Sequence, residues 1–493
     1  GYKTTLNAGT LYPVFVDEAV PGDTFDIKAT MFGRLGTPLK PIMDNIKFDL
    51  HFFSVPYRLV WDNWEKFNGA QTDPGDSTAY TIPTITSTAS TGYGEESIFD
   101  YFGLPTKIPD LEHSALPFRA MNLIWNQWYR DENIQDSLAV YTDDGPDLPA
   151  EYDLLKRNKR KDYFTAALPW AQKGDQVSIP LGTTAPVETD GNVFKFASDG
   201  VGSNPQNIYS TGTNNYIVGT TGFTGNAYFE SGLQADLSTA TAATINALRE
   251  AFQIQKMYER DARGGTRYIE LIKAHFGITS PDARLQRPEY LGGGSSDVNI
   301  SPVAQTSESL TGTPQGNLSG IGTFSVNNNG FVKSFTEHEI VLGFVSVRAD
   351  LNYQQGLHKM WSRSTRFDFY WPSFANLGEQ AILNKEIYAQ GSLAATDDDA
   401  FGYQERYAEY RYKPSQITGL YRSNATASLD LWHLAQDFSA LPALNSAFIE
   451  ENPPIDRVIA VPAEPQFLLD CYFDFKASRP MPTYATPGLI DHF

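Results

Sequence analysis

The sequence is poor in cysteine and in positive charge, and each shortage excludes a class of protein. Cys471 is the single cysteine among 493 residues. No intramolecular disulfide can therefore form, and the chain is not a disulfide-stapled secreted domain. Lysine and arginine number 38 against 58 aspartates and glutamates, giving a formal net charge of −20. Such a surface repels phosphate, so any contact with nucleic acid must be a local basic patch or pass through a basic partner.

Long apolar runs and catalytic motifs are also missing. No apolar stretch approaches the length of a membrane span, so we expect no membrane insertion. The seven histidines are scattered, and no cysteine pair exists, so we predict no metal site and no cofactor. Neither a Gly-x-Ser-x-Gly elbow nor a phosphate loop is present. We predict no catalytic residue and no enzymatic activity, although the aromatic residues and many carboxylates leave a carbohydrate-binding or carbohydrate-active β-sandwich as an alternative.

Alternating apolar residues predict β-strands near both ends of the chain. They occupy every second position in residues 25–31, 46–52 and 467–475, with Lys47, Asp49 and His51 on the second face of the middle segment. Residues 340–345 are apolar on both faces, which indicates a strand that is buried on both sides. Strands at the two ends must pair non-locally. We therefore predict an all-β sandwich or jelly roll with long insertions rather than alternating strands and helices.

Helices and polar segments interrupt this pattern. Helical spacing of apolar residues predicts one helix through residues 118–128, a second from residue 245 to the Gly264-Gly265 pair, and a third over 268–276. Residues 174–243 are dominated by Gly, Thr, Ser and Asn, so we interpret them as a surface insertion. Residues 292–330 are again rich in Gly and Ser, and we interpret them as polar loop, with Gly292-Gly293-Gly294 as a hinge.

One basic cluster stands out against the acidic background. It consists of Lys156, Arg157, Lys159, Arg160 and Lys161, with Tyr163 and Phe164 directly after it. Cations neutralise phosphates and aromatic rings stack on unpaired bases, so the cluster is a candidate contact for nucleic acid or for a basic partner. The alternatives are a solvated charged turn and a patch of intersubunit salt bridges.

An aromatic stretch follows later in the chain. Trp361, Arg363, Arg366 and Trp371 stand in a segment that also contains Phe367, Phe369 and Tyr370. Guanidinium groups among aromatic rings are typical of an interface hot spot or a base-stacking surface, and we predict a subunit interface here. For most of the rings, ordinary core packing is the competing interpretation.

Several strings are distributed through nearly the whole chain. They are Lys3-Thr4-Thr5-Leu6-Asn7-Ala8-Gly9, Val55-Pro56-Tyr57-Arg58-Leu59-Val60-Trp61-Asp62-Asn63-Trp64, Asp162-Tyr163-Phe164-Thr165-Ala166-Ala167-Leu168-Pro169-Trp170, Trp361-Ser362-Arg363, Leu377-Gly378-Glu379-Gln380 and Thr486-Pro487-Gly488-Leu489-Ile490-Asp491-His492-Phe493. In these strings, and in their order, the chain resembles the major capsid proteins of microviruses, close to the gokushovirus branch. The resemblance fails between residues 174 and 243 and is weak over residues 292–330.

The resemblance implies a viral eight-stranded antiparallel jelly roll, in a T=1 icosahedral capsid around circular single-stranded DNA. It implies residues 1–173 as the first part of the jelly roll, 174–243 as a threefold protrusion that contacts a host cell-surface receptor, 244–330 as a helical and Gly/Ser-rich insertion, and 331–493 as the remaining strands and a C-terminal arm. It also implies a small basic DNA-binding phage protein as a partner, and a virion assembled in the cytoplasm of the bacterial host.

Overall fold

The computed structural model describes residues 1–481 apart from 78, 175–176, 178–186, 189–194, 199–205, 211–214, 218–226, 232–233, 236–244, 266–267, 278–285, 313, 351 and 394. The chain divides into two compact units: unit 1 comprises Gly1–Ala171 and Thr266–Phe493, and unit 2 comprises Gln172–Gly265. Most of the predicted insertion at 174–243 and the end of the predicted C-terminal arm lie outside the described residues. The described part of the insertion falls within unit 2.

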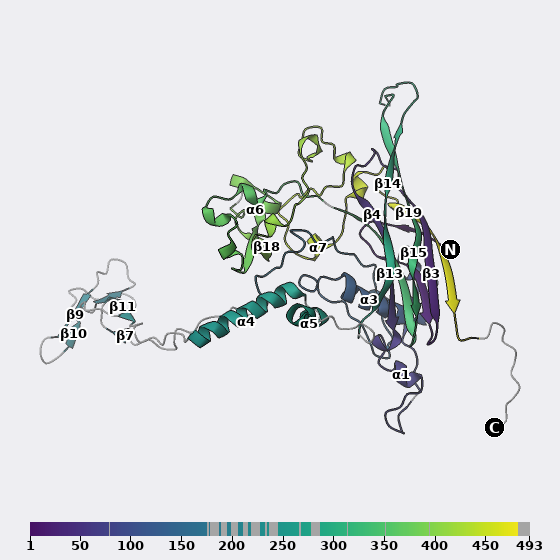
Figure 1. Cartoon of the computed structure of the whole chain (residues 1–493), viewed down its shortest axis with the longest axis horizontal. Helices are drawn as coiled ribbons and strands as arrows, with labels where there is room; N and C mark the ends of the chain where they lie inside the picture. Colours follow the sequence, from purple (N-terminus) through teal and green to yellow (C-terminus); the bar gives the residue numbers. More distant parts are fainter. Residues whose placement is uncertain are drawn as a thin grey trace. The chain divides into compact units, whose positions relative to one another are not determined.

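Two antiparallel sheets form the centre of unit 1 (Figure 1). The five-stranded sheet has the order β1 (Tyr2–Leu6), β19 (Phe467–Ser478), β3 (Thr24–Leu35), β15 (Leu318–Ser334) and β14 (Asn299–Ala304). The four-stranded sheet has the order β13 (Glu289–Asp297), β4 (Ile46–Pro56), β16 (Glu339–Ala349) and β2 (Tyr12–Ala19). The mainly β architecture agrees with the predicted class. The predicted non-local pairing is confirmed, because β19 pairs with both β1 and β3.

The inner faces of the two sheets share one hydrophobic core. Residues of β3 alternate strictly between buried and solvent-facing positions from Phe25 to Leu35, as their period of two predicts. Their buried side chains join those of β4, β15 and β16 in a single cluster. Phe48 of β4 stacks on Phe324 of β15 with ring centroids 4.4 Å apart, which ties one sheet to the other.

The other face of the four-stranded sheet is covered as well. The helix α3 (Leu116–Ile124) and the segment around Trp61 pack on it and form a second core with Leu342 and Phe344 of β16. Ten of the eleven residues of β16 are therefore buried, which confirms the strand predicted to be apolar on both faces. The second face of β4 is also enclosed, so Asp49 lies in the interior instead of facing water.

The remaining strands and α-helices are short, apart from α4 (Ile245–Gly264), which has 20 residues. In unit 1 they are β5 (Thr84–Thr86), β6 (Glu112–Ser114), β17 (Glu379–Leu383), β18 (Ala400–Glu405), α1 (Trp64–Phe67), α2 (Ile98–Tyr101), α5 (Tyr268–Phe276), α6 (Asn384–Ile387) and α7 (Ser446–Ile449). In unit 2 they are β7 (Val187–Glu188), β8 (Lys195–Ser198), β9 (Gln206–Ser210), β10 (Asn215–Ile217), β11 (Ala227–Ser231), β12 (Gln234–Ala235) and α4 (Ile245–Gly264). The helices predicted at 245–264 and 268–276 are confirmed.

One prediction about the fold is wrong. Residues 292–330 contain most of β13, all of β14 and most of β15, so the segment interpreted as polar loop supplies strands to both sheets. The three glycines interpreted as a hinge pair with β4. A Cβ atom on Gly293 would lie 2.0 Å from the carbonyl oxygen of Leu50, so only glycine fits this backbone approach.

Candidate functional site

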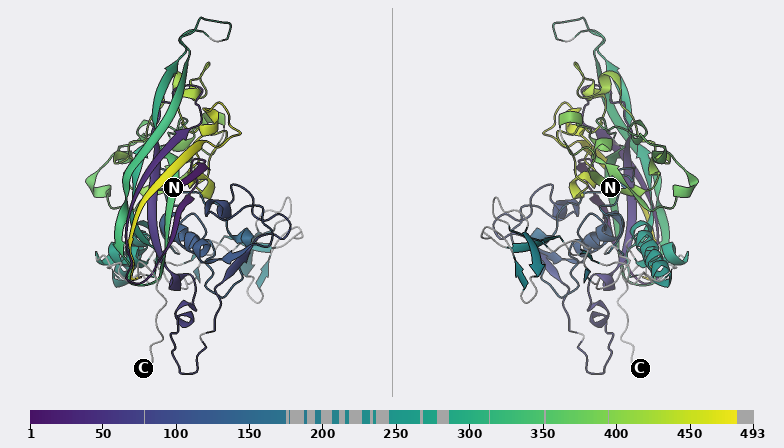
Figure 2. Two further views of the ribbon diagram at one scale, coloured as in Figure 1. Left: turned by 90° about the vertical axis from the view of Figure 1, so that its right-hand side faces the viewer. Right: turned by 90° about the vertical axis from the view of Figure 1, so that its left-hand side faces the viewer.

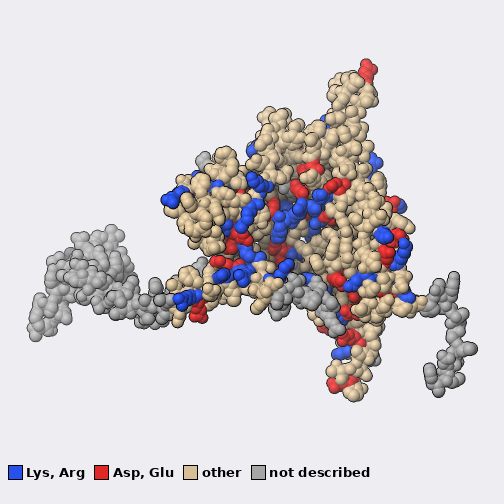
Figure 3. Space-filling view, viewed as in Figure 1, with Lys and Arg blue, Asp and Glu red and all other residues tan. Residues whose placement is uncertain are grey.

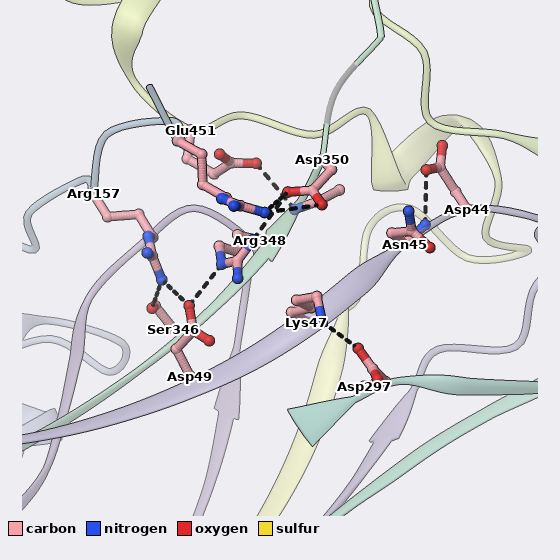
Figure 4. Close-up of polar contacts among 12 residues, drawn as sticks. Asp44, Asn45, Lys47, Asp49, Arg157, Asp297, Ser346, Arg348, Asp350 and Glu451 are labelled. Atoms are coloured by element: carbon pink, nitrogen blue, oxygen red, sulfur yellow. Dashed lines mark hydrogen bonds and ion pairs between the residues drawn. The ribbon is translucent and has the colours of Figure 1, made fainter. Parts of the chain in front are cut away.

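The basic cluster lies in an extended segment that runs along the buried side of β4 and β16. Arg157 points inward: its Nη1 donates hydrogen bonds to the Oδ2 of Asp49 and to the Oγ of Ser346, both at 2.7 Å (Figure 4). Arg348 of β16 donates from Nε to the same Asp49 oxygen at 2.8 Å and from Nη1 to Asp350 at 3.0 Å. One carboxylate therefore holds two guanidinium groups between the sandwich and the segment that covers it.

The electrostatics of this cluster follow from burial and pairing. Burial by itself would raise the pKa of Asp49, but the charge of Arg157, with further hydrogen bonds and the charge of Arg348, holds that pKa below its ordinary value. Nearby, burial raises the pKa of Glu451, whose carboxylate accepts a hydrogen bond from the backbone N–H of Ala349 at 3.1 Å. The charges of Asp49, Arg157 and Arg348 are thus compensated within the chain, and their ion pairs attach the covering segment to the sandwich.

The other basic residues divide between interior and surface. Lys159 is buried, donates to the carbonyl of Phe448 at 2.5 Å and lies 4.7 Å from the centre of its ring. Desolvation lowers the pKa of Lys159 to about 8. Arg160 and Lys161 are exposed and form ion pairs with Asp350 and Asp131. Lys156 is partly buried, and its carbonyl accepts from the indole N–H of Trp125 at 2.8 Å.

The five residues therefore do not form one solvated patch. Lys159, Arg160 and Lys161 line a groove of about 240 Å³, together with Lys413 and Asp350, but of these three only Arg160 and Lys161 are exposed. Figure 3 shows lysine and arginine side chains beside acidic ones in the hollow between the sandwich and the part of unit 1 that carries α6 and β18. A phosphate or an acidic group entering this groove would compete with Asp350 and Asp131 for the two cations.

The aromatic stretch lies on the surface. We call residues 360–371 together with Tyr410 the aromatic surface. Within it, Trp361 is 69% exposed and Phe367 is 56% exposed, and the other rings are exposed as well. The interpretation of these rings as ordinary core packing is therefore wrong for the isolated chain. A contiguous set of exposed aromatic residues is the composition expected of a surface that another molecule covers.

Contacts within the chain hold the aromatic surface in place. Arg363 donates to the buried carboxylate of Glu409 at 2.9 Å, and its guanidinium lies 4.3 Å from the centre of the Tyr410 ring. Arg366 lies 5.3 Å from the ring of Trp371, whose indole N–H donates to the Arg366 carbonyl at 2.8 Å. Because the rings are already ordered, binding a partner costs little side-chain entropy.

Sequence reasoning missed the acidic partners. Asp49, Asp350 and Glu409 neutralise three of the predicted cations, although each is distant in the chain from the arginine it binds. One signal was available: a charged residue in an otherwise apolar strand, as Asp49 is in β4, predicts a buried partner of opposite charge. Within the described residues, no group of three or more His, Cys, Asp or Glu side chains is arranged to hold a metal ion. No described helix is long and apolar enough to cross a membrane.

A double-sheet scaffold with long insertions and an exposed, ordered aromatic surface is typical of proteins that associate with further copies. The family model described as capsid protein (F protein) matches residues 1–489, so this chain belongs to that family of phage capsid proteins. The resemblance to microvirus major capsid proteins drawn from the sequence is thereby confirmed.

Relatives from three phages support the same assignment along the whole chain. Capsid protein VP1 of Bdellovibrio phage phiMH2K is 52% identical, and the alignment covers 100% of this chain and 95% of the relative. Capsid protein VP1 of Chlamydia phage 1 is 44% identical, with 99% and 94% covered. Capsid protein VP1 of Spiroplasma virus 4 is 36% identical, with 98% and 93% covered. These relatives are structural proteins, which favours a shell role over the carbohydrate-active alternative.

Proposed function

We propose that copies of this chain assemble into a closed T=1 icosahedral shell around circular single-stranded DNA, within the cytoplasm of the bacterial host. The observation that carries the proposal is the family match, which extends over residues 1–489. Eight of the nine strands in the two sheets would form the viral jelly roll, with β2, β16, β4 and β13 as one of its sheets and β1, β19, β3 and β15 as the other. The two facing antiparallel sheets and the long insertions between their strands support this topology.

The aromatic surface is the proposed subunit interface, with Trp361, Arg363, Arg366 and Trp371 as its main contacts. Tryptophan and arginine dominate binding energy at interfaces. Trp361 and Trp371 are exposed, Arg366 lies over the Trp371 ring, and the partly buried Arg363 supports the surface from below through Tyr410. Self-association would remove this apolar area from water, which is the main favourable term in protein assembly.

Particle formation tests both proposals. The full-length chain would be expressed with the other phage proteins and measured by sedimentation velocity, with electron micrographs of the same sample. We expect uniform closed particles from the wild type, and slower-sedimenting species from the Trp361→Ser/Trp371→Ser variant. The matched control replaces two exposed apolar residues elsewhere, as Ile108→Ser/Leu148→Ser. Normal particles from the tryptophan variant would show that the aromatic surface is not a subunit interface. A wild type that never forms closed particles would contradict the proposed shell.

Arg160 and Lys161 are the proposed contact with DNA or with a small basic DNA-binding phage protein. Lys156, Arg157 and Lys159 belong to the same segment and would hold the two contact residues in position. The two exposed cations line the groove, whereas Arg157 and Lys159 are committed to internal partners. The Arg160→Ala/Lys161→Ala variant should retain less DNA per particle. The Lys107→Ala/Lys385→Ala variant makes the same change in charge at two other surface ion pairs and should retain the normal amount.

The insertion at residues 174–243 is the proposed host attachment element, reaching a receptor on the cell surface. Its described strands fall in unit 2, which is compact in its own right. Replacing residues 174–243 by a short Gly/Ser linker should leave particle formation intact and abolish adsorption to host cells. Loss of particles, or normal adsorption by particles without the insertion, would contradict this role.

A further inference from the structure

No described element packs on the outer face of the five-stranded sheet (Figure 2). α3 and the segments around it pack on the other sheet, and Figure 2 (left) turns β19 and β3 toward the viewer with no other described element across them. Burial follows the same pattern, because every second residue of β3 from Lys28 to Arg34 is exposed while its neighbours are buried. The side chains on this outer face are therefore not held by packing against other described parts of the chain.

Two aromatic rings lie next to each other on this face. Phe32 of β3 is 57% exposed and Tyr472 of β19 is 61% exposed. Phe32 is paired with Asp470, and Tyr472 is paired with Thr30, so the two rings are diagonal neighbours on adjacent strands. Diagonal neighbours in an antiparallel pair are about 7–8 Å apart, which is within reach of aromatic side chains. Exposed aromatic side chains in adjacent positions indicate a binding surface.

Cations flank the rings along the same strand. Lys28 and Arg34 occupy exposed positions of β3 on the same face as Thr30 and Phe32. Among the described residues, neither Lys28 nor Arg34 has an ion pair or a side-chain hydrogen bond, whereas Lys3 is paired with Asp470 at 2.6 Å. Two acids lie on the same face, Asp474 opposite Lys28 and Asp470 opposite Phe32, but they form ion pairs with Lys476 and Lys3. Lys28 and Arg34 are therefore cations without an ion pair among the described residues, beside exposed aromatic rings, on a chain of charge −20.

A bulge in β15 adds amide groups to the same place. The register between β15 and β3 shifts between Val326 and Asn329, opposite Thr30. Asn327 and Asn328 are both exposed there. Asparagine side chains offer one acceptor and two donors, which match the edges of nucleic acid bases.

We infer that this face binds unpaired nucleotides. Phe32 and Tyr472 stack on bases, Lys28 and Arg34 contact the neighbouring phosphates, and Asn327 and Asn328 supply hydrogen bonds to base edges. Open antiparallel sheets with aromatic residues on adjacent strands hold single-stranded nucleic acid in this way in other folds. A second copy of the chain is the weaker candidate, because interface cores are depleted in lysine and aspartate, and this face carries Lys28, Asp470 and Asp474. The inference rests on the proposed enclosure of single-stranded DNA.

The test measures binding of a fluorescent 20-nucleotide oligothymidylate to the full chain by anisotropy, between 50 and 200 mM NaCl. The Phe32→Leu/Tyr472→Leu variant keeps apolar area but loses both rings, so its affinity should fall by about tenfold or more. The Phe32→Trp/Tyr472→Trp variant should retain the affinity. Lys28→Ala/Arg34→Ala should reduce the slope of log K against log salt by about 1.4, since each phosphate contact on a single strand contributes about 0.7. Lys107→Ala/Lys385→Ala, with the same change in charge, should leave the slope unchanged.

Sedimentation of the same variants separates this inference from the shell proposal. Reduced oligonucleotide affinity in the leucine variant, with normal particle formation, supports the inference. Unchanged affinity in the leucine variant, or an equal loss in the charge-matched control, overturns it and leaves the shell proposal intact. If the leucine variant loses self-association while its oligonucleotide affinity is unchanged, the face binds a second copy and the inference is wrong. A wild type that binds the oligonucleotide but forms no particles would contradict the shell alone.

Discussion

Replacing Asp49 by asparagine should destabilise unit 1 strongly. The carboxylate pairs with Arg157 at 2.7 Å and with Arg348 at 2.8 Å; Asp49 is buried, and the two arginine side chains are only 11–12% exposed. Asparagine has nearly the same shape and keeps one acceptor oxygen, but it leaves Arg157 without a counter-charge and Arg348 with Asp350 alone. Removing one partner from a buried ion pair costs about 3–5 kcal/mol, and the retained acceptor places this variant near the lower limit. We therefore expect a loss of about 3 kcal/mol in the free energy of unfolding.

The assay is urea unfolding of the unassembled subunit at pH 7, followed by tryptophan fluorescence. The Trp361→Ser/Trp371→Ser background should keep the subunit from assembling. The control is Asp297→Asn, which removes an ion pair with Lys47 at a surface site where the carboxylate is 70% exposed. Surface pairs contribute about 0–1 kcal/mol, so the control should unfold close to the wild type. A loss of less than 1 kcal/mol in Asp49→Asn, or equal losses in both variants, would refute the argument that this cluster anchors the covering segment.

The pH dependence of the free energy of unfolding provides a second test of the Asp49 ion pairs. Because the pKa of Asp49 is lowered in the folded state, its contribution is fully present above the pKa of the unfolded chain. The contribution is lost as the pH falls through the folded-state pKa. The difference in stability between wild type and Asp49→Asn should therefore shrink on acidification below about pH 4 and should be constant from pH 5 to 7.

Three further perturbations test other parts of the structure. Gly330→Ala should cost about 3 kcal/mol or more, because its Cβ would lie 1.8 Å from the carbonyl oxygen of Ile27, whereas Gly75→Ala meets nothing within 4 Å and should be neutral in thermal unfolding. Lys159 has a lowered pKa of about 8, so the wild type should gain up to about 3 kcal/mol over Lys159→Met as the pH rises from 8 to 10.5, measured by urea unfolding; no gain would contradict a buried charged lysine. Arg363→Met should cost about 3 kcal/mol by leaving the Glu409 carboxylate buried without a cation, and Arg411→Met, at an exposed pair, should cost at most about 1 kcal/mol in the same assay.

The strands that were predictable are those whose environment repeats every two residues. β3 and β19 contain alternating apolar residues because one face packs on the core and the other meets water. β13 and the middle of β15 were missed because their glycines and serines are typical of loops. Gly293 and Gly330 have backbone atoms of a neighbouring strand at the place where a Cβ would lie. Strand propensity reflects packing against neighbours, and here the neighbour is too close for any side chain.

The sequence was sufficient to locate the candidate sites, but it did not predict which of their side chains are buried. Arg157 and Lys159 bind partners within the chain, whereas Arg160 and Lys161 are exposed, and a count of positive charges cannot distinguish the two pairs. For the aromatic surface, composition identified the rings, but only the structure shows that nothing in the described chain covers them.

The place of β19 in its sheet has a consequence for biosynthesis. Lys3 of β1 pairs with Asp470 of β19 across 467 residues of chain, and β19 lies between β1 and β3. While a ribosome is still making the intervening chain, one edge of β3 is left without its neighbour, and β1 has no strand to join. The strands β1 and β3 therefore cannot complete their pairing until β19 has been synthesised. A polypeptide released early, without β19, would expose the edge of β3 and be prone to aggregate instead of entering a particle.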